Sequence, residues 1–99
     1  MRLRWTPTAL RNLSEIHTYI ADNSEIAAAR IMQLLQTQAE SLADFPGKGR
    51  PGRIPRTREL ITVGLPYIIA YRISDQKIEI IAVRHSSRKW PKSFENPNR

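Results

Sequence analysis

Three runs of apolar, β-branched and aromatic residues follow one another in the second half of the chain. They span residues 58–63, 66–72 and 78–83, and short polar or glycine-containing breaks separate them. Runs of this length and composition predict an antiparallel three-stranded meander. A basic segment at 84–91, which contains a His and a Trp, follows the third run directly. One face of such a sheet needs an apolar cover.

The first half of the chain supplies that cover as two amphipathic helices. Residues 1–5 alternate Arg with apolar residues and predict a short strand. Thr6 and Pro7 then suit the N-cap and the first position of a helix. Asn23-Ser24 separates the two helices, and the second ends near Phe45-Pro46. Apolar positions recur at helical spacing at Leu10, Leu13, Ile16, Tyr19 and Ile20, and at Ala27, Ala28, Ile31, Leu34, Leu35, Ala39 and Leu42.

This order of elements predicts an α+β fold, in which an N-terminal strand is followed by an α-helical hairpin packed on an antiparallel sheet. We expect a single domain over residues 1–91, because a chain of 99 residues is long enough for one modest core. Residues 92–99 are rich in Pro and Asn, and we expect them to form a loosely held tail.

Strict alternation along each strand assigns the sheet residues to two faces. In the second run it places Tyr67, Ile69, Tyr71 and Ile73 on one face, and Ile68, Ala70 and Arg72 on the other. In the third run it places Ile78, Ile80 and Ala82 on one face, and Ile81, Val83 and His85 on the other. Because both faces carry apolar residues, we expect the face away from the helices to expose hydrophobic surface for a partner protein.

Composition excludes several classes of protein. The chain has no Cys, which excludes a disulfide scaffold, a Cys-ligated zinc site and thiol catalysis. His17 and His85 are its only histidines, so we expect neither a metal site nor a cofactor. No apolar run approaches the length of a membrane span, and the N-terminus lacks the core of a signal peptide. We therefore expect a cytoplasmic protein with no membrane partner.

Positive charge is concentrated in the second half of the chain. Residues 1–46 carry four Lys/Arg and five Asp/Glu, whereas residues 47–99 carry twelve and four, for a net charge of +7. A nearly neutral half joined to a strongly basic half indicates an anionic partner, either a nucleic acid or an acidic protein segment. An excess of Arg that merely aids solubility is the alternative, and the segregation of the charge favours a partner.

Residues 47–55 form the one clear predicted loop, because three Gly and two Pro interrupt regular structure there. The loop and the residues just after it supply five cations without an acid, and Arg56 is one of them. Such a loop is able to bind phosphate, although it lacks the pattern of a P-loop. A solvated connection is the equal alternative. The candidate anion ligands are Lys48, Arg50, Arg53 and Arg58.

Seven segments match, in order and at compatible spacing, a known family pattern. They are Trp5 with Ala9 and Leu13, then residues 19–21, 42–46, 49–52, 57–60, 66–72 and 85–91. Together they resemble the RelE/ParE superfamily of bacterial toxins from type II toxin–antitoxin systems, over nearly the whole chain. The resemblance implies a small α+β toxin that inhibits growth and is neutralised by a cognate antitoxin.

The resemblance also implies one of two mechanisms. ParE-type members inhibit DNA gyrase and serve in plasmid stabilisation, whereas RelE-type members cleave mRNA on the ribosome without metal. Residues 58–60, 66–69 and 85–91 look more like the ParE-type branch, so we expect a gyrase inhibitor that is not an enzyme. Operator DNA is then reached only through the antitoxin complex. The expected target-binding residues are Arg84, Arg88, Lys89 and Trp90, and the expected antitoxin-binding residues are Tyr67, Tyr71 and Arg72.

The alternative is a ribosome-dependent, metal-independent endoribonuclease that acts on mRNA. Its candidate catalytic residues are Arg58, Arg72, His85 and Arg88, because guanidinium groups clamp phosphate and a His titrates near neutral pH. A second alternative is a toxin fold without activity, which acts only with its antitoxin as a co-repressor module.

Several of these residues also have purely structural interpretations. Arg58 and Glu59 are neighbours on a strand and therefore lie on opposite faces, so they form no catalytic pair. Arg72 suits an ion pair with Glu79 across the hairpin. We favour a hydrogen-bonding role for His85 at the end of the sheet over catalysis, and tyrosines 67 and 71 are either core residues or antitoxin contacts.

Overall fold

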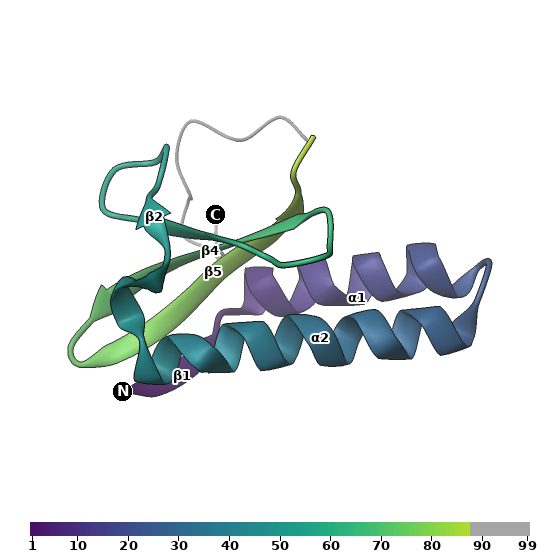
Figure 1. Cartoon of the computed structure of the whole chain (residues 1–99), viewed down its shortest axis with the longest axis horizontal. Helices are drawn as coiled ribbons and strands as arrows, with labels where there is room; N and C mark the ends of the chain where they lie inside the picture. The colour runs from purple at the N-terminus through teal and green to yellow at the C-terminus, as the bar shows by residue number, and fades with distance from the viewer. Residues whose placement is uncertain (88–99) are drawn as a thin grey trace.

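The molecule has two layers, in which a pair of helices covers one face of a twisted sheet (Figure 1). The computed structural model describes residues 1–87. The predicted tail at 92–99 lies outside the described residues, as do Arg88, Lys89 and Trp90. The predicted α+β fold is confirmed, because an N-terminal strand and two helices precede the antiparallel strands.

The sheet has five strands in the order β1-β5-β4-β3-β2. The elements are β1 (Arg2–Trp5), α1 (Pro7–Ala21), α2 (Glu25–Asp44), the 3-10 turn η1 (Pro46–Lys48), β2 (Arg50–Pro51), β3 (Arg58–Ile61), β4 (Tyr67–Ser74) and β5 (Lys77–His85). The three predicted runs form β3, β4 and β5. The N-terminal strand joins the sheet in parallel beside β5, while β2 is a two-residue strand within the predicted loop.

Both helices begin at the predicted caps. The Thr6 side chain accepts a hydrogen bond from Ala9 N at 3.2 Å, and the Ser24 side chain accepts one from Ala27 N at 3.0 Å. The apolar face of α1 is narrower than its pattern suggested, because Leu10 and Tyr19 are largely exposed. Neither helix among residues 1–87 combines the length and apolar character that a bilayer crossing requires.

One hydrophobic core lies between the helices and the sheet. Its most completely buried large side chains include Tyr71, Leu35, Leu42 and Ile69. It comprises Ala9, Leu13, Leu35, Ala39, Leu42, Leu60, Tyr67, Ile69, Tyr71, Ile78, Ile80 and Val83.

A β-bulge in β5 changes the predicted faces of the third run. Ala70 pairs with Ala82 but Tyr71 pairs with Ile80, so Ile81 is an extra residue without a partner in β4. Val83 and Ile80 consequently lie on the same face, and both belong to the core. The predicted assignment, with Ile80 and Ala82 on one face and Val83 on the other, is therefore wrong.

Two side chains stabilise this bulge. Since β1 ends at Trp5, it offers β5 no strand partner beyond that point. The Thr6 hydroxyl lies 2.8 Å from the carbonyl oxygen of Ile80 and 3.3 Å from that of Ile81. The Asn12 side-chain oxygen accepts a hydrogen bond from Val83 N at 3.0 Å. Side chains at the start of α1 thus supply hydrogen-bond partners to the irregular backbone of β5.

The sheet face opposite the helices differs from the prediction of an open hydrophobic surface. Ile68, Ala70 and Ala82 on this face are all buried. Its polar positions hold ion pairs between Arg and Glu59 or Glu79. The expectation of an exposed apolar face holds only in part, because Ile61, the partner of Ile68 in β3, is 51% exposed on this face, whereas Ile68, Ala70 and Ala82 are buried.

Candidate functional site

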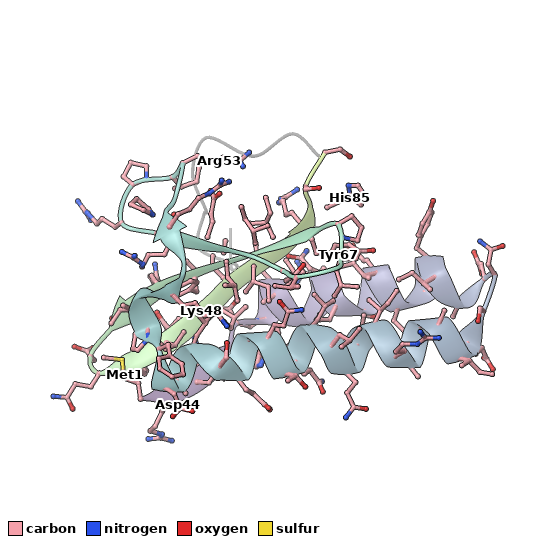
Figure 2. All side chains as sticks on the ribbon, viewed as in Figure 1. Met1, Asp44, Lys48, Arg53, Tyr67 and His85 are labelled. Carbon is pink, nitrogen blue, oxygen red and sulfur yellow. The ribbon has the colours of Figure 1, made fainter. Side chains whose placement is uncertain are left out.

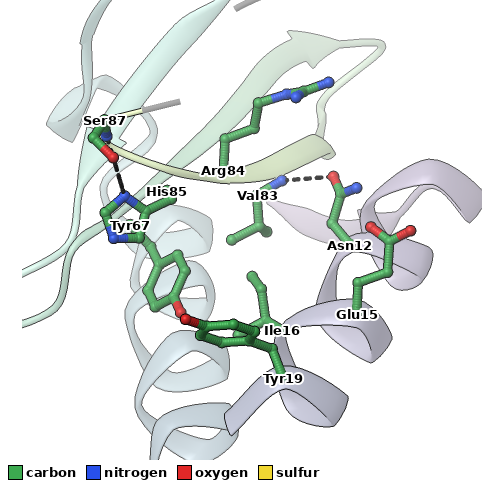
Figure 3. Close-up of a pocket in the computed structure, with 9 residues that line it drawn as sticks. All are labelled: Asn12, Glu15, Ile16, Tyr19, Tyr67, Val83, Arg84, His85 and Ser87. Atoms are coloured by element: carbon green, nitrogen blue, oxygen red, sulfur yellow. Dashed lines mark hydrogen bonds between the residues drawn. The ribbon is translucent and has the colours of Figure 1, made fainter. Parts of the chain in front are cut away.

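An open cleft of about 620 Å³ lies where α1 passes the end of β5 (Figure 3). Its lining residues come from α1, from the start of β4 and from the end of β5. They are Asn12, Glu15, Ile16, Tyr19, Tyr67, Val83, Arg84, His85 and Ser87. The bulge in β5 creates this arrangement, because it turns Val83 and His85 towards the helices.

Tyr67 and Ser87 hold the His85 ring at the end of the sheet. Its ring meets the ring of Tyr67, its partner in β4, edge to face, with centroids 5.7 Å apart. The backbone N–H of Ser87 donates to His85 Nδ1 at 3.2 Å, and the Ser87 hydroxyl lies 2.8 Å from the same nitrogen. The interpretation of His85 as a hydrogen-bonding residue at the sheet's end is confirmed. Because Nδ1 accepts, the neutral ring carries its proton on Nε2.

Two tyrosines, from β4 and α1, line the cleft. Tyr67 is buried, and this burial, together with the nearby Tyr19, raises the pKa of its phenol above the ordinary value. Tyr19 is 77% exposed, at the α1 side of the cleft. In Figure 3 the Tyr67 hydroxyl points towards the Tyr19 ring. The cleft therefore offers aromatic and hydroxyl surface to a partner, with the carboxylate of Glu15 on its rim.

Arg84 has a different orientation from its neighbours. It pairs with Ile68 in β4, on the face away from the helices, and its side chain points away from Tyr67 and His85 (Figure 3). Its Nε is buried and, among the described residues, has no hydrogen-bond partner. Buried donors without a partner are unusual in a folded protein, and the Nε of Arg58 is a second one among residues 1–87.

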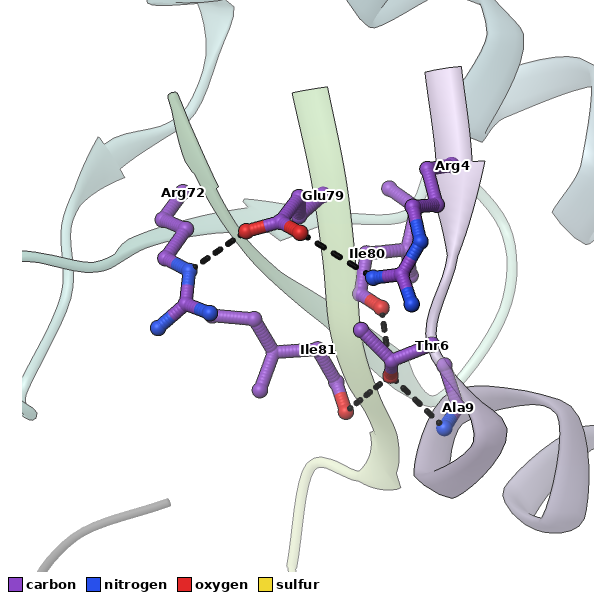
Figure 4. A network of polar contacts seen from close by, with 7 residues as sticks. All are labelled: Arg4, Thr6, Ala9, Arg72, Glu79, Ile80 and Ile81. Carbon is purple, nitrogen blue, oxygen red and sulfur yellow. Dashed lines mark hydrogen bonds and ion pairs between the residues drawn. The ribbon is translucent and has the colours of Figure 1, made fainter. Parts of the chain in front are cut away.

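Glu79 joins two arginines across three strands of the face away from the helices (Figure 4). Arg72 Nε donates to one carboxylate oxygen at 2.8 Å, and Arg4 Nη1 donates to the other at 3.0 Å. The hydrogen bond from Arg72 lowers the pKa of Glu79 and outweighs the opposing effect of burial, while Arg4 adds to the lowering. The predicted ion pair of Arg72 with Glu79 is confirmed.

Glu59 forms a second cluster on the same face. Its side chain is only 1% exposed, and it accepts hydrogen bonds from Arg50 Nη2 at 3.0 Å and from Arg53 Nε at 3.1 Å. Burial alone raises the pKa of this carboxyl, but the Arg53 backbone N–H at 2.9 Å and the two guanidinium groups more than compensate. The net pKa of Glu59 therefore lies below its ordinary value. The predicted loop contains no acidic residue, and its arginines pair instead with Glu59 of β3.

Arg58 and Lys48 lie elsewhere. Arg58 Nη2 donates to the carbonyl oxygens of Gly47 and Gly49, away from Glu59, which confirms that Arg58 and Glu59 lie on opposite faces. Lys48 Nζ donates to the Ser41 hydroxyl of α2 at 3.2 Å. The four predicted anion ligands therefore form two separate groups rather than one cradle.

Comparison with known proteins identifies the family. Residues 3–90 match the family described as the ParE toxin of the type II toxin–antitoxin system, parDE. The chain belongs to the ParE toxin family. It is 49% identical to the Y4kP protein of Sinorhizobium fredii, over 91% of this chain and 93% of that protein. It is 40% identical to toxin RelE2 of Caulobacter vibrioides, over 85% of this chain and 93% of the toxin.

Solved structures agree with this assignment. The chromosomal ParDE toxin–antitoxin system from P. aeruginosa matches with a TM-score of 0.77 and 26% identity, over 86% of this chain and 95% of that chain. The RelBE2 toxin–antitoxin complex of Mycobacterium tuberculosis matches with a TM-score of 0.63 and 26% identity, over 85% and 95% respectively. The protein is a type II toxin of the RelE/ParE superfamily.

The toxin does not bring its candidate ribonuclease residues together. Arg58 pairs with Tyr71 and His85 pairs with Tyr67, so their partners are four residues apart on β4, about 13 Å along the strand. Arg72 lies on the opposite face of the sheet from His85, bound to Glu79. Arg88, the fourth member, lies outside the described residues.

The three predicted antitoxin contacts differ in exposure, and Tyr67 is only 7% exposed. Tyr67 borders the cleft, and the Arg72 side chain is half exposed. Tyr71 is fully buried, with its hydroxyl bonded to Gly49 and Pro46, so its prediction as an antitoxin contact is wrong. Tyr71 lies on the core face of the sheet, and its hydroxyl already forms two hydrogen bonds within the fold.

The sequence analysis missed the contribution of α1 to the cleft. Asn12 and Glu15 lie at helical spacing with Tyr19 on one flank of α1, and these two polar residues, unlike Tyr19, are not part of the predicted apolar stripe. This flank of α1 lines a cleft only because the bulge brings the end of β5 against it. His17 is exposed, and residues 1–87 contain no cluster of three or more His, Cys, Asp or Glu suited to a metal ion.

Proposed function

We propose that this toxin arrests growth by binding DNA gyrase and that a cognate antitoxin neutralises it. One observation carries the choice of gyrase over mRNA. The described members of the ribonuclease set lie in separate places, and two of them are already bonded within the fold, Arg58 to backbone carbonyls and Arg72 to Glu79. Membership of the ParE family supports the same choice.

The proposed contact with gyrase is the basic segment that begins at Arg84. The Arg84 side chain points away from the core side, and its buried Nε lacks a partner among residues 1–87. Arg84 as a residue is only partly buried, so its positive charge remains available to an acidic surface on a partner. Arg88, Lys89 and Trp90 extend the proposed surface as predictions from the sequence.

The proposed antitoxin contacts are Tyr67 and Arg72, which lie on opposite faces of the sheet, so the antitoxin would wrap around it. The similar solved structures are of toxin–antitoxin systems, which supports a cognate antitoxin for this chain. The cleft beside Tyr67 exposes the ring of Tyr19, and aromatic side chains of this kind often anchor protein interfaces. Operator DNA then enters only through the antitoxin complex.

Ribosome-dependent mRNA cleavage is the second candidate function, and a different observation favours it. The relatives from Caulobacter vibrioides are named RelE2 and RelE3. In addition, one cleft contains a carboxylate, Glu15, and the His85 imidazole, which are groups suited to acid–base chemistry.

Induced expression in cells separates the candidates. A gyrase inhibitor blocks replication and triggers a DNA-damage response, whereas a ribonuclease halts translation first. Co-expression of the antitoxin should abolish either effect. Translation arrest before any change in DNA synthesis would overturn the gyrase proposal, and the absence of any growth defect would leave only the inactive co-repressor module.

A further inference from the structure

An arginine occupies a turn position that usually requires glycine. Thr57 N donates to the carbonyl oxygen of Ile54 at 3.2 Å, which closes a four-residue turn with Pro55 in its second position. Arg56, in the third position, has a φ of 64°. This is the arrangement of a type II turn, in which the third residue is normally Gly or Asn, because a Cβ crowds the left-handed backbone.

Nothing in the described part of the fold uses the Arg56 side chain. It is exposed, and no hydrogen bond or ion pair within residues 1–87 involves its guanidinium group. The turn itself is anchored by its neighbours, since Ile54 is buried and the Thr57 hydroxyl also donates to the Ile54 carbonyl at 2.6 Å. The arginine therefore strains the turn without stabilising it, and strain of this kind clusters at functional sites.

The turn belongs to a loop that already presents two fixed guanidinium groups. The Arg50 and Arg53 side chains are 50% and 42% exposed, and both bind the buried carboxylate of Glu59. One negative charge thus orients two positive ones, and Arg56 adds a third on the same loop. Because Glu59 restrains Arg50 and Arg53, less side-chain entropy is lost when they bind an anion.

We propose that Arg50, Arg53 and Arg56 together form a surface that binds the phosphodiester backbone of a nucleic acid. Guanidinium groups pair with phosphate oxygens in a bidentate manner, and backbone contacts need no apolar surface. Within residues 50–58 the one apolar side chain other than proline, Ile54, is buried, so the loop offers no hydrophobic anchor to a protein partner. None of its residues belongs to the proposed gyrase contact, which begins at Arg84 in β5.

The test measures binding of the full-length toxin to a short DNA duplex of arbitrary sequence and to a single-stranded RNA, by fluorescence anisotropy at several salt concentrations. Arg56→Gly removes the cation and also relieves the strained backbone, so Tm should stay the same or rise. The affinity of this variant for nucleic acid should fall several-fold at low salt. The negative slope of log K against log salt should become shallower by about one. Adding Arg50→Gln should make the slope shallower by about one more.

The matched control is Gln76→Gly. Gln76 also has a positive φ, of 60°, in the turn between β4 and β5, so this variant relieves the same kind of strain without removing a charge. It should bind nucleic acid like the wild type. The affinities of the wild-type toxin for DNA and for RNA are compared, and the tighter of the two identifies the preferred nucleic acid.

Three results would overturn the proposal: no salt-dependent binding of either nucleic acid, an unchanged slope in Arg56→Gly, or an equal loss in Gln76→Gly. Binding of a polyglutamate peptide that depends on Arg56, without nucleic-acid binding, would also overturn it and indicate an acidic protein partner. The assay contains neither gyrase nor ribosomes, so its outcome is independent of the proposed function.

Discussion

The Tyr71 hydroxyl accepts a hydrogen bond from the backbone N–H of Gly49 at 2.9 Å and donates one to the Pro46 carbonyl oxygen at 2.7 Å. Through these two bonds, a side chain in the middle of the sheet fixes the turn that leads from α2 into the basic loop. Figure 2 shows the helical side of this junction around Asp44 and Lys48. The position of the loop arginines therefore depends on a core residue.

Gly49→Ala should destabilise the toxin by about 2–3 kcal/mol, because overpacking at a closed site has this size of effect. A Cβ at this position would lie 2.7 Å from the Tyr71 ring and hydroxyl and 2.8 Å from the backbone oxygen of Glu59. Urea denaturation measures the change in the free energy of unfolding. Gly47→Ala is the control, since a Cβ there meets nothing within 4 Å, and an equal loss in both variants would contradict the explanation.

Thr6→Val should lower the free energy of unfolding by about 2 kcal/mol, because it removes a helix cap and leaves the bulge carbonyls of Ile80 and Ile81 without the hydroxyl donor. Thr6→Ser keeps the hydroxyl and should recover most of the loss. The two variants differ chiefly in hydrogen bonding, so thermal and urea unfolding of both would test this role. Equal stability of the Val and Ser variants would show that the hydroxyl is not important.

Stability should fall as the pH drops to about 4.5 and below, the ordinary range of Glu. The pKa values of Glu59 and Glu79 are lowered in the folded state, so near this pH the unfolded chain binds more protons than the folded one. Linkage then requires the free energy of unfolding to decrease as the pH decreases. Urea denaturation across this range measures the slope.

Glu59→Gln should flatten this pH dependence more than Glu79→Gln does. The arginines paired with both carboxylates are about half exposed, but the Glu59 side chain is 1% exposed and that of Glu79 is 10% exposed, and Glu59 also accepts the Arg53 backbone N–H, so water screens the bonds of Glu59 less. At neutral pH, Glu59→Gln should also cost about 1–3 kcal/mol through weaker bonds to Arg50 and Arg53. A pH profile identical to that of the wild type would contradict the assignment of Glu59.

Gln38→Ala should loosen the turn between β3 and β4. The Gln38 side chain accepts from Val63 N at 2.8 Å and donates to the Val63 carbonyl at 3.1 Å, which fixes this exposed turn to α2. We expect faster hydrogen exchange at the Val63 amide and a loss of about 1 kcal/mol. Gln36→Ala, at an exposed position of the same helix, is the control and should change neither quantity.

Local signals in the sequence predicted most of the fold. Thr6 with Pro7 and Ser24 mark the helix starts by their own hydrogen-bonding capacity, and the β-branched runs at 58–63, 66–72 and 78–83 identify the strands. These features depend on neighbours in the chain, so a single sequence is enough to read them.

The faces at the end of β5 and the geometry of the site were not predictable in the same way. The bulge at Ile81 depends on Thr6 and Asn12, which are more than sixty positions away in sequence. It reverses the face of Val83 and creates the cleft beside Tyr67. Likewise, the loop arginines pair with Glu59 of β3. This ion pair depends on the pairing of β2 with β3, which composition does not reveal.

We propose that this ParE-family toxin acts on gyrase rather than on mRNA. The most direct test is a supercoiling assay with purified gyrase and increasing amounts of toxin, run beside an mRNA cleavage assay on translating ribosomes. We predict loss of supercoiling with intact mRNA, and a weaker effect for Arg84→Ala than for the exposed helix control Arg30→Ala. Cleaved mRNA with unaffected gyrase would contradict the account and direct attention to Glu15 and His85.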